Sequence, residues 1–106
     1  MQENTTMQTS VSKFIEQYGL HSGPAVRYID LVSEVGELGK ELLKGSDYGK
    51  NAFTVDEHGT EEMGDCLFSL LALCCELHID ANEALAAALQ KYEARFSAKG
   101  NIGSGR

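Results

Sequence analysis

Apolar residues recur every three or four positions along most of the chain, which is the spacing of one face of an α-helix. The first such segment spans residues 9–18. A short break follows, and Pro24 then suits the first turn of a second helix, with Ser22 or Gly23 as its N-cap. That second helix is expected over residues 25–44, where one apolar stripe consists of Ile29, Val32, Val35, Leu38 and Leu42.

A third helix is predicted after a polar loop. Thr54 and Glu57 have the spacing of a capping box, which predicts a helix start near Val55, and Thr60 offers a later start. The helix is expected to run to about His78, and its middle is apolar on nearly every side. A helix of that kind is buried all round. Four helices cannot all surround one of their own number, so this pattern predicts a homo-oligomer.

A fourth helix is expected over residues 81–98, because Asp80 and Glu83 match a second capping box. Strand patterns are weak throughout the chain. The expected fold class is therefore all-α, a four- to five-helix antiparallel bundle. The apolar stripe of this last helix consists of Leu85, Ala88, Leu89, Tyr92 and Phe96.

Length and composition describe one acidic domain. The 106 residues carry 9 basic and 16 acidic side chains, which gives a formal net charge of −7. A chain this acidic lacks the basic surface that binds nucleic acid or an anionic membrane. We expect a single domain over residues 1–106, with flexible ends at residues 1–8 and 99–106. No apolar run in the sequence is long enough to cross a bilayer.

The three cysteines are Cys66, Cys74 and Cys75. On one helix, Cys66 and Cys74 would lie about 12 Å apart along the axis, which is too far for a disulfide. No cysteine or histidine spacing of a zinc site is present. We therefore expect buried, reduced thiols in a cytoplasmic protein.

Two stretches of the chain repeat one acidic pattern. Glu34 and Glu37 form the first pair, and Glu62 and Asp65 form the second. Acids three residues apart lie on the same face of a helix, one turn from each other. Two carboxylates about 5 Å apart repel by about 3 kcal/mol at an effective dielectric of about 20. Two such pairs on neighbouring antiparallel helices favour a bound cation, and a solvated acidic face is the alternative.

The ligand set separates the possible cation sites. Oxygen ligands select Mg²⁺, Mn²⁺ or Ca²⁺. A di-iron helical bundle requires Glu-x-x-His pairs, and no glutamate in this sequence has a histidine three residues later. The di-iron class is therefore excluded. Gly36 and Gly64, one inside each acidic pair, indicate either a close approach of two helix backbones or room for a ligand.

Three stretches together resemble a known enzyme family: SEVGELGKELLKG, EEMGDCLFSLLAL and KYEARF, at residues 33–45, 61–73 and 91–96. They are similar to the motifs of the MazG-like all-α nucleoside triphosphate pyrophosphohydrolases. Relatives of that group include the dimeric dUTPases, the dCTP pyrophosphatases and the phosphoribosyl-ATP pyrophosphohydrolases. Ser33 stands where the family often has a further acid, and Tyr92 stands where an asparagine often follows the lysine.

The resemblance implies Mg²⁺-dependent cleavage of a nucleoside triphosphate to the monophosphate and pyrophosphate, with Mn²⁺ able to substitute. The substrate would be an NTP or dNTP, with non-standard nucleotides and sanitation of the nucleotide pool as one role. By match to the motif, Glu34, Glu37, Glu62 and Asp65 would bind the metal. Glu61 is the candidate for a base, or for an acid behind the metal ligands.

Cationic side chains are expected to bind the phosphates. Lys91 and Arg95 lie one turn apart on the last predicted helix, and Lys44 flanks the central loop. The expected partners are a nucleoside triphosphate and further copies of the chain, as a dimer or a dimer of dimers. Two alternatives stay open: a non-catalytic helical oligomerisation module with a structural cation, and a phosphoribosyl-ATP-type pyrophosphohydrolase.

Overall fold

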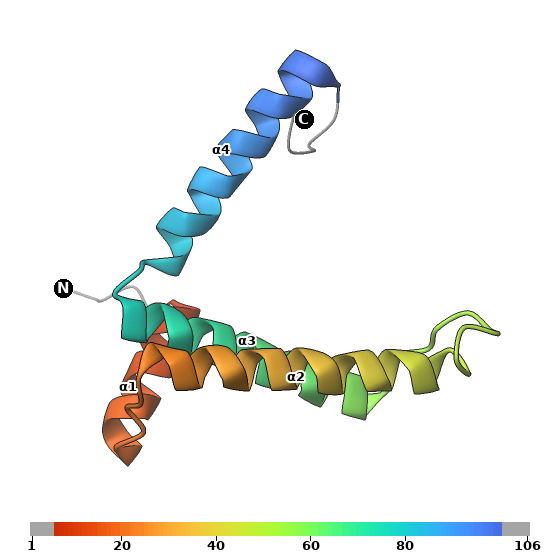
Figure 1. Ribbon diagram of the computed structural model, residues 1–106, viewed down its shortest axis with the longest axis horizontal. Helices are drawn as coiled ribbons and strands as arrows, with labels where there is room; N and C mark the ends of the chain where they lie inside the picture. Colours follow the sequence, from red (N-terminus) through yellow and green to blue (C-terminus); the bar gives the residue numbers. More distant parts are fainter. Residues whose placement is uncertain (1–5, 101–106) are drawn as a thin grey trace.

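The computed structural model describes residues 6–100, and all regular structure in that range is α-helical. This confirms the all-α part of the prediction. Residues 1–5 and 101–106 of the expected flexible ends lie outside the described residues, and the prediction of flexibility was wrong for Met7 and Gln8, which belong to the first helix. The helices, labelled in Figure 1, are α1 (Met7–Tyr18), α2 (Pro24–Gly45), α3 (Glu57–Leu77) and α4 (Ala81–Lys99).

The ends of α1 and α2 follow from local sequence. Thr6 is the N-cap of α1, and its hydroxyl accepts a hydrogen bond from the Thr9 amide. Gly19 closes that helix in the left-handed region, at φ 63°. Pro24 is the first residue of α2 and Gly23 is its N-cap, which is one of the two predicted caps.

The predicted start of α3 was wrong. Its N-cap is Asp56, whose carboxylate accepts the Gly59 amide at 3.1 Å. Thr54 is engaged elsewhere, because its amide and its hydroxyl both donate to the carbonyl of Gly45. Thr60 already lies within the first turn. The predicted caps therefore miss Asp56: Thr54 lies two residues before it, and Thr60 lies four residues after it.

The core lies where α1 and α2 pack against α3. Helices α2 and α3 run antiparallel along their lengths (Figure 1). Ile15, Leu71 and Ala72 are almost fully buried between the helices. The Phe14 and Phe68 rings meet edge to face, with their centroids 6.0 Å apart. These contacts hold the three helices as one unit.

Arg27 is an unexpected member of that unit. Its side chain is only 8% exposed, although a charged residue is costly to bury. The guanidinium donates to the Leu20 carbonyl and lies 5.8 Å from the centroid of the Phe68 ring. Arg27 therefore connects the start of α2 to Leu20, in the loop between α1 and α2, and to Phe68 of α3.

Helix α4 leaves this unit at a sharp angle and points away from it (Figure 1). Within the described residues it makes no extended contact with α1, α2 or α3. Its apolar stripe is open, with Leu85, Leu89 and Phe96 each 58–59% exposed. One chain therefore forms a three-helix unit with a projecting arm, and the expected four- to five-helix antiparallel bundle is not completed within a single chain.

The third helix also keeps open apolar surface. Within one chain, Met63, Leu67 and Leu70 are 40–55% exposed. The sequence predicted that a second copy of the chain covers part of this helix, and a single chain leaves that prediction untested. The radius of gyration is 17.1 Å, against about 13 Å for a compact domain of this length. Over residues 6–100, none of the helices has the length and apolar character needed to cross a membrane.

Candidate functional site

Antiparallel packing of α2 and α3 brings acids from both predicted pairs together. Oxygen atoms of Glu34, Glu62 and Asp65 all lie within 4.8 Å of one another. Glu34 and Glu62 are half-buried, whereas Asp65 is exposed. We call these three residues the acidic cluster. They are 28 and 31 residues apart in sequence across the two helices, so only the fold makes them neighbours.

The electrostatics of the acidic cluster are unfavourable without a counter-ion. The pKa of Glu62 is raised, first by desolvation and then by the negative charges of Asp65 and Glu34. Smaller contributions come from Glu37 and Glu41 on the next turns of α2. The ion pairs of His21, Lys40, Lys44 and His58 go to Glu16, Glu76, Glu37, Glu41 and Glu61, and none of these acids belongs to the acidic cluster. Positive charge from outside the chain would stabilise this arrangement.

Glu37 lies beside the acidic cluster rather than in it. Its carboxylate is 3.8 Å from the Lys40 ammonium, one turn along α2. Glu41 is placed similarly, 3.8 Å from Lys44. Three members of the predicted quartet therefore converge, and the fourth stands at the edge. Glu41 follows Glu34 by two turns of the helix, and that spacing is the sequence signal that connects it to the site.

A cleft of about 470 Å³ opens next to the acidic cluster. This volume lies within the range of small-molecule sites. The C-terminal half of α2, the following loop and the first turns of α3 form its walls. Acids dominate the lining, with one cation and one aromatic ring. The lining residues are Glu37, Glu41, Lys44, Gly45, Phe53, Thr54, Asp56, His58, Gly59 and Glu62.

Gly45 shapes one end of this cleft. A Cβ atom at Gly45 would collide with the Phe53 ring. Without that atom, Phe53 lies against the last turn of α2, and Thr54 bonds to the Gly45 carbonyl. Phe53 is still 40% exposed. The loop therefore offers the cleft a partly open aromatic ring.

Gly36 and Gly64 have no such role within one chain. A Cβ atom at either position would meet nothing within 4 Å outside its own helix backbone. Neither glycine is needed for the approach of α2 to α3. The expectation of a close backbone contact is therefore wrong for a single chain, and open space lies beside both acidic pairs.

Glu61 stands apart from the acidic cluster. Its carboxylate faces His58 Nδ1 at 3.5 Å, its side chain is 71% exposed, and it does not line the cleft. Lys44 does line the cleft, as the sequence suggested. The structure thus brings one of these two candidates to the site and leaves the other on the outer surface of α3.

Lys91 and Arg95 are not brought to the acidic cluster of their own chain. Glu62 lies about 22 Å from the end of α3, at 1.5 Å per residue. Arg95 lies a similar distance from the start of α4. Because α4 points away from the other helices (Figure 1), these two lengths separate Arg95 from the cluster. The Lys91 ammonium instead lies 5.2 Å from the centroid of the neighbouring Tyr92 ring.

The cysteines are free thiols with restricted reactivity. Cys66 is buried, and Cys74 and Cys75 are half-buried. Burial raises the pKa of the Cys66 thiol, with further contributions from Glu34 and Glu62. Burial also raises the pKa of Cys74. A protonated thiol is a poor nucleophile and metal ligand, so the chemistry of the site rests on oxygen atoms.

The donor set fits a hard divalent cation. Carboxylate oxygens are the ligands that Mg²⁺ and Mn²⁺ prefer in proteins. The acidic cluster supplies three of them within the span of one coordination sphere. A larger hollow of about 570 Å³ lies at the other end of α3, but its lining contains a single acid, Asp80. The two hollows are therefore chemically different, and the smaller one carries the carboxylate oxygens that a divalent cation prefers.

The family comparison agrees with this geometry. A family model described as the MazG nucleotide pyrophosphohydrolase domain matches residues 27–98, which is more than half of the chain. Searches of curated proteins and of solved structures find no significant match. The matched range contains the acidic cluster, the cleft and most of α4. The chain therefore belongs to the MazG nucleotide pyrophosphohydrolase domain family.

Proposed function

We propose that the protein is a Mg²⁺-dependent nucleotide pyrophosphohydrolase, which converts a nucleoside triphosphate to the monophosphate and pyrophosphate. The observation that carries the proposal is the acidic cluster beside the cleft, inside the range matched by the family model. Family membership alone supports the reaction class. The cluster supports it independently, because three close carboxylates repel one another and a divalent cation, which a triphosphate carries, would relieve that repulsion.

Charge explains why the cation is required for binding. The chain carries a formal charge of −7, and acids dominate the cleft. A triphosphate would be repelled from such a surface. In our proposal Glu34, Glu62 and Asp65 hold the metal, and Glu37 and Glu41 add negative charge behind it. A bound Mg²⁺ supplies charge neutralisation of the phosphates and a lower pKa for water.

The remaining lining of the cleft has two proposed roles. Lys44 reaches the cleft from the last turn of α2 and would bind a phosphate oxygen as a point charge. Phe53 offers an apolar ring on which the nucleobase could stack. The cleft carries no set of converging amide groups that would read one base, so the proposal names a nucleoside triphosphate without choosing its base.

Lys91 and Arg95 enter this proposal through a second copy of the chain. In a homodimer, α4 of each copy would lie on the other, and its two cations would approach the partner's acidic cluster. The open apolar stripe of α4 and the open face of α3 support this arrangement. The chain exposes 7953 Å², about 2,100 Å² more than a compact monomer of its mass. Obligate homodimers bury areas of that order.

The direct test is an assay of the purified protein with a panel of canonical and modified triphosphates and a phosphoribosyl nucleotide. Pyrophosphate and orthophosphate are measured separately, with Mg²⁺, with Mn²⁺ and with a chelator. We expect pyrophosphate, released only with metal. Release of orthophosphate and a nucleoside diphosphate would contradict the proposal. A metal-induced rise in melting temperature without any turnover would instead identify a structural cation in a non-catalytic module.

A complementation test addresses the second copy. Two inactive variants, Asp65→Asn and Arg95→Ala, are mixed in equal amounts after reversible dissociation. If Arg95 acts on the partner's site, each mixed dimer has one intact site, and about a quarter of wild-type turnover returns. If Arg95 serves its own chain, no mixed dimer has an intact site and turnover stays at baseline. The double variant mixed with wild type is the matched control.

A further inference from the structure

The direction of α4 depends on a short elbow between α3 and α4. His78 closes α3 in the left-handed region at φ 57°, which is unusual for a residue other than glycine. Ile79 follows, and Asp80 is extended at φ −79° and ψ 114°. Because α4 has no extended contact with the other described helices, the backbone angles of these residues set where it points.

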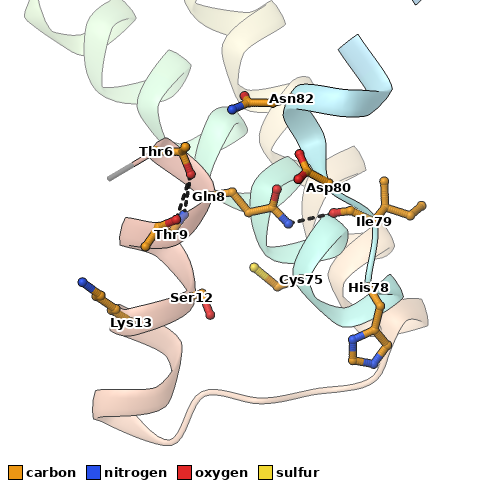
Figure 2. A pocket seen from close by; sticks show the side chains of 10 residues that line it. All are labelled: Thr6, Gln8, Thr9, Ser12, Lys13, Cys75, His78, Ile79, Asp80 and Asn82. Carbon is orange, nitrogen blue, oxygen red and sulfur yellow. Dashed lines mark hydrogen bonds between the residues drawn. The ribbon is translucent and has the colours of Figure 1, made fainter. Parts of the chain in front are cut away.

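A side chain from α1 binds both sides of this elbow. Gln8 Nε2 donates to the Ile79 carbonyl at 2.7 Å, and Gln8 Oε1 accepts from the Ala81 amide at 2.7 Å. Figure 2 shows Gln8 reaching from α1 across to Ile79, beside Asp80. Both distances are at the short end of the range for N–H···O bonds. One amide therefore engages the backbone on each side of Asp80.

The chemistry of this contact is that of a β-ladder. In an extended residue, the preceding carbonyl and the following amide point to the same side, and a partner residue on a neighbouring strand can bind both through its own amide and carbonyl. The primary amide of Gln8 has the one donor and one acceptor that this requires. The contact also satisfies the first amide of α4, one of the groups that a helix leaves without an internal partner.

Two features make this contact more than a local cap. The Asp80 carboxylate already caps α4 by accepting the Glu83 amide at 3.1 Å, so the helix does not need Gln8 in order to start. Gln8 also lies in α1, outside residues 27–98 of the family match. The helix that precedes the matched domain thus fixes the one joint from which α4 leaves it.

We propose that Gln8 is a positioning residue that sets the direction of α4. By holding Asp80 extended, it keeps the elbow bent, so that α4 does not swing freely or continue the axis of α3. The arm is then aimed away from its own α2 and α3. Docking of that arm on a second copy rests on the proposed function, whereas the clamp itself does not.

The test compares Gln8→Ala with wild type, and Gln17→Ala at the exposed far end of α1 is the matched control. Spin labels are placed through non-natural amino acids at Thr60 and Ser97, which leaves the native cysteines untouched. Labelled chains are diluted with unlabelled chains, so only distances within one chain are measured. We expect the distance distribution of Gln8→Ala to be at least about twice as wide as wild type, and Gln17→Ala to match wild type.

Two further readouts separate positioning from general destabilisation. The Ala81 amide should exchange its hydrogen about tenfold faster in Gln8→Ala, while the Gly59 amide of α3 keeps its wild-type rate. Gln8→Glu provides a rescue. A protonated carboxyl has the donor and acceptor of an amide, so the distribution should be wide at neutral pH and narrow near pH 4. Wild type, which also carries His78 and Asp80 near this joint, is measured at both pH values as reference.

An unchanged distance distribution in Gln8→Ala would overturn the proposal, as would a wide distribution for Gln8→Glu at both pH values. Equal acceleration of exchange at Ala81 and Gly59 would also overturn it, because the effect would then be global. None of these measurements uses turnover. A protein that hydrolyses no triphosphate can still show the clamp, and an active enzyme can still lack it, so the two proposals fail separately.

Discussion

Helices α3 and α4 are similar in length but depend on different forces. Helix α3 contains Gly59 and Gly64, which weaken a helix, and it buries Cys66, Leu71 and Ala72 against its neighbours. Helix α4 is rich in alanine and is closed by Asp80 at one end and Gly100 at the other. Packing therefore maintains α3, and local sequence maintains α4. The difference teaches that forming a helix and placing it are separate problems.

The same contrast divides the charged groups. The acids of α2 and α3 are adjacent because the two helices pack, and their separation is fixed by the core. The cations of α4 are placed by their own helix alone, since α4 has no extended contact with another helix in the described part of the chain. The acidic cluster is thus formed within one chain, whereas in our proposal Lys91 and Arg95 reach a phosphate only in an assembly of two chains.

The largest expected effect comes from a substitution in the acidic cluster, which the packing of α2 on α3 forms. Asp65→Asn removes a charged oxygen from the acidic cluster while keeping the shape of the side chain. We expect turnover to fall by about 10² to 10³, the usual cost of losing such a group. Glu57→Gln, an exposed acid in the first turn of the same helix, is the matched control. Steady-state assays in Mg²⁺ measure both, and equal activities would remove the acidic cluster from the mechanism.

The next effect concerns the arm. Leu85→Ser combined with Leu89→Ser makes the α4 stripe polar at two positions that are 58–59% exposed in one chain. Completing the burial of each leucine against a partner is worth about 1 kcal/mol, and a symmetric dimer has four such sites. Self-association should weaken at least about 100-fold by sedimentation. Ala87→Gln on the opposite face of α4 should associate as wild type does, and a double variant that does so too would argue against the covered stripe.

The N-caps of α3 and α4 can be compared directly, because each cap makes one hydrogen bond of the same length. Asp56→Ala and Asp80→Ala each remove one carboxylate-to-amide bond of 3.1 Å, worth about 1 kcal/mol. Loss of the α3 cap should lower the free energy of global unfolding by about that amount. Loss of the α4 cap should mainly increase amide exchange within α4 in the dissociated protein. The same drop in global stability for both variants would contradict independent stabilisation of the arm.

The smallest effect is a pH dependence within the packed unit. His21 lies 2.6 Å from Glu16 of α1 and 3.4 Å from Glu76 of α3, and these carboxylates raise its pKa above 6.5. Its stabilising effect is complete below that unfolded value and is lost as the pH rises through the raised pKa. The melting temperature should fall slightly between about pH 6 and pH 8. His21→Gln should flatten this slope, and an unchanged slope would assign it to other groups.

Much of the fold followed from the sequence because its signals are local. Pro24 and Asp80 mark helix starts through their own backbone and side-chain chemistry, and both were placed correctly. The prediction of the α3 start was wrong because Thr54 and Asp56 are both possible N-caps. Thr54 donates instead to the Gly45 carbonyl, which leaves Asp56 as the cap. The acidic pairs were visible as spacing, and antiparallel packing brought three of their four members together.

The features that could not be predicted are contacts between distant positions. Gln8 meets Ile79 across 71 residues, and nothing in a polar first turn indicates that partner. Arg27 reads as a surface cation, yet it is buried over Phe68. The direction of α4 depends on such contacts. For that reason the sequence placed Lys91 and Arg95 on one face of a helix and could not say which chain they would serve.

The missing side chain at Gly45 has a consequence for how this protein could diversify. Phe53 occupies the space that a larger residue would fill, and it walls the end of the cleft. An uncharged side chain there would displace the ring without changing the charge of the cleft. The size of the residue at position 45 therefore determines the volume of the cleft, independently of the carboxylates that line it. Substitution at this one position would change the size of the molecule that the cleft admits while the carboxylates stay unchanged.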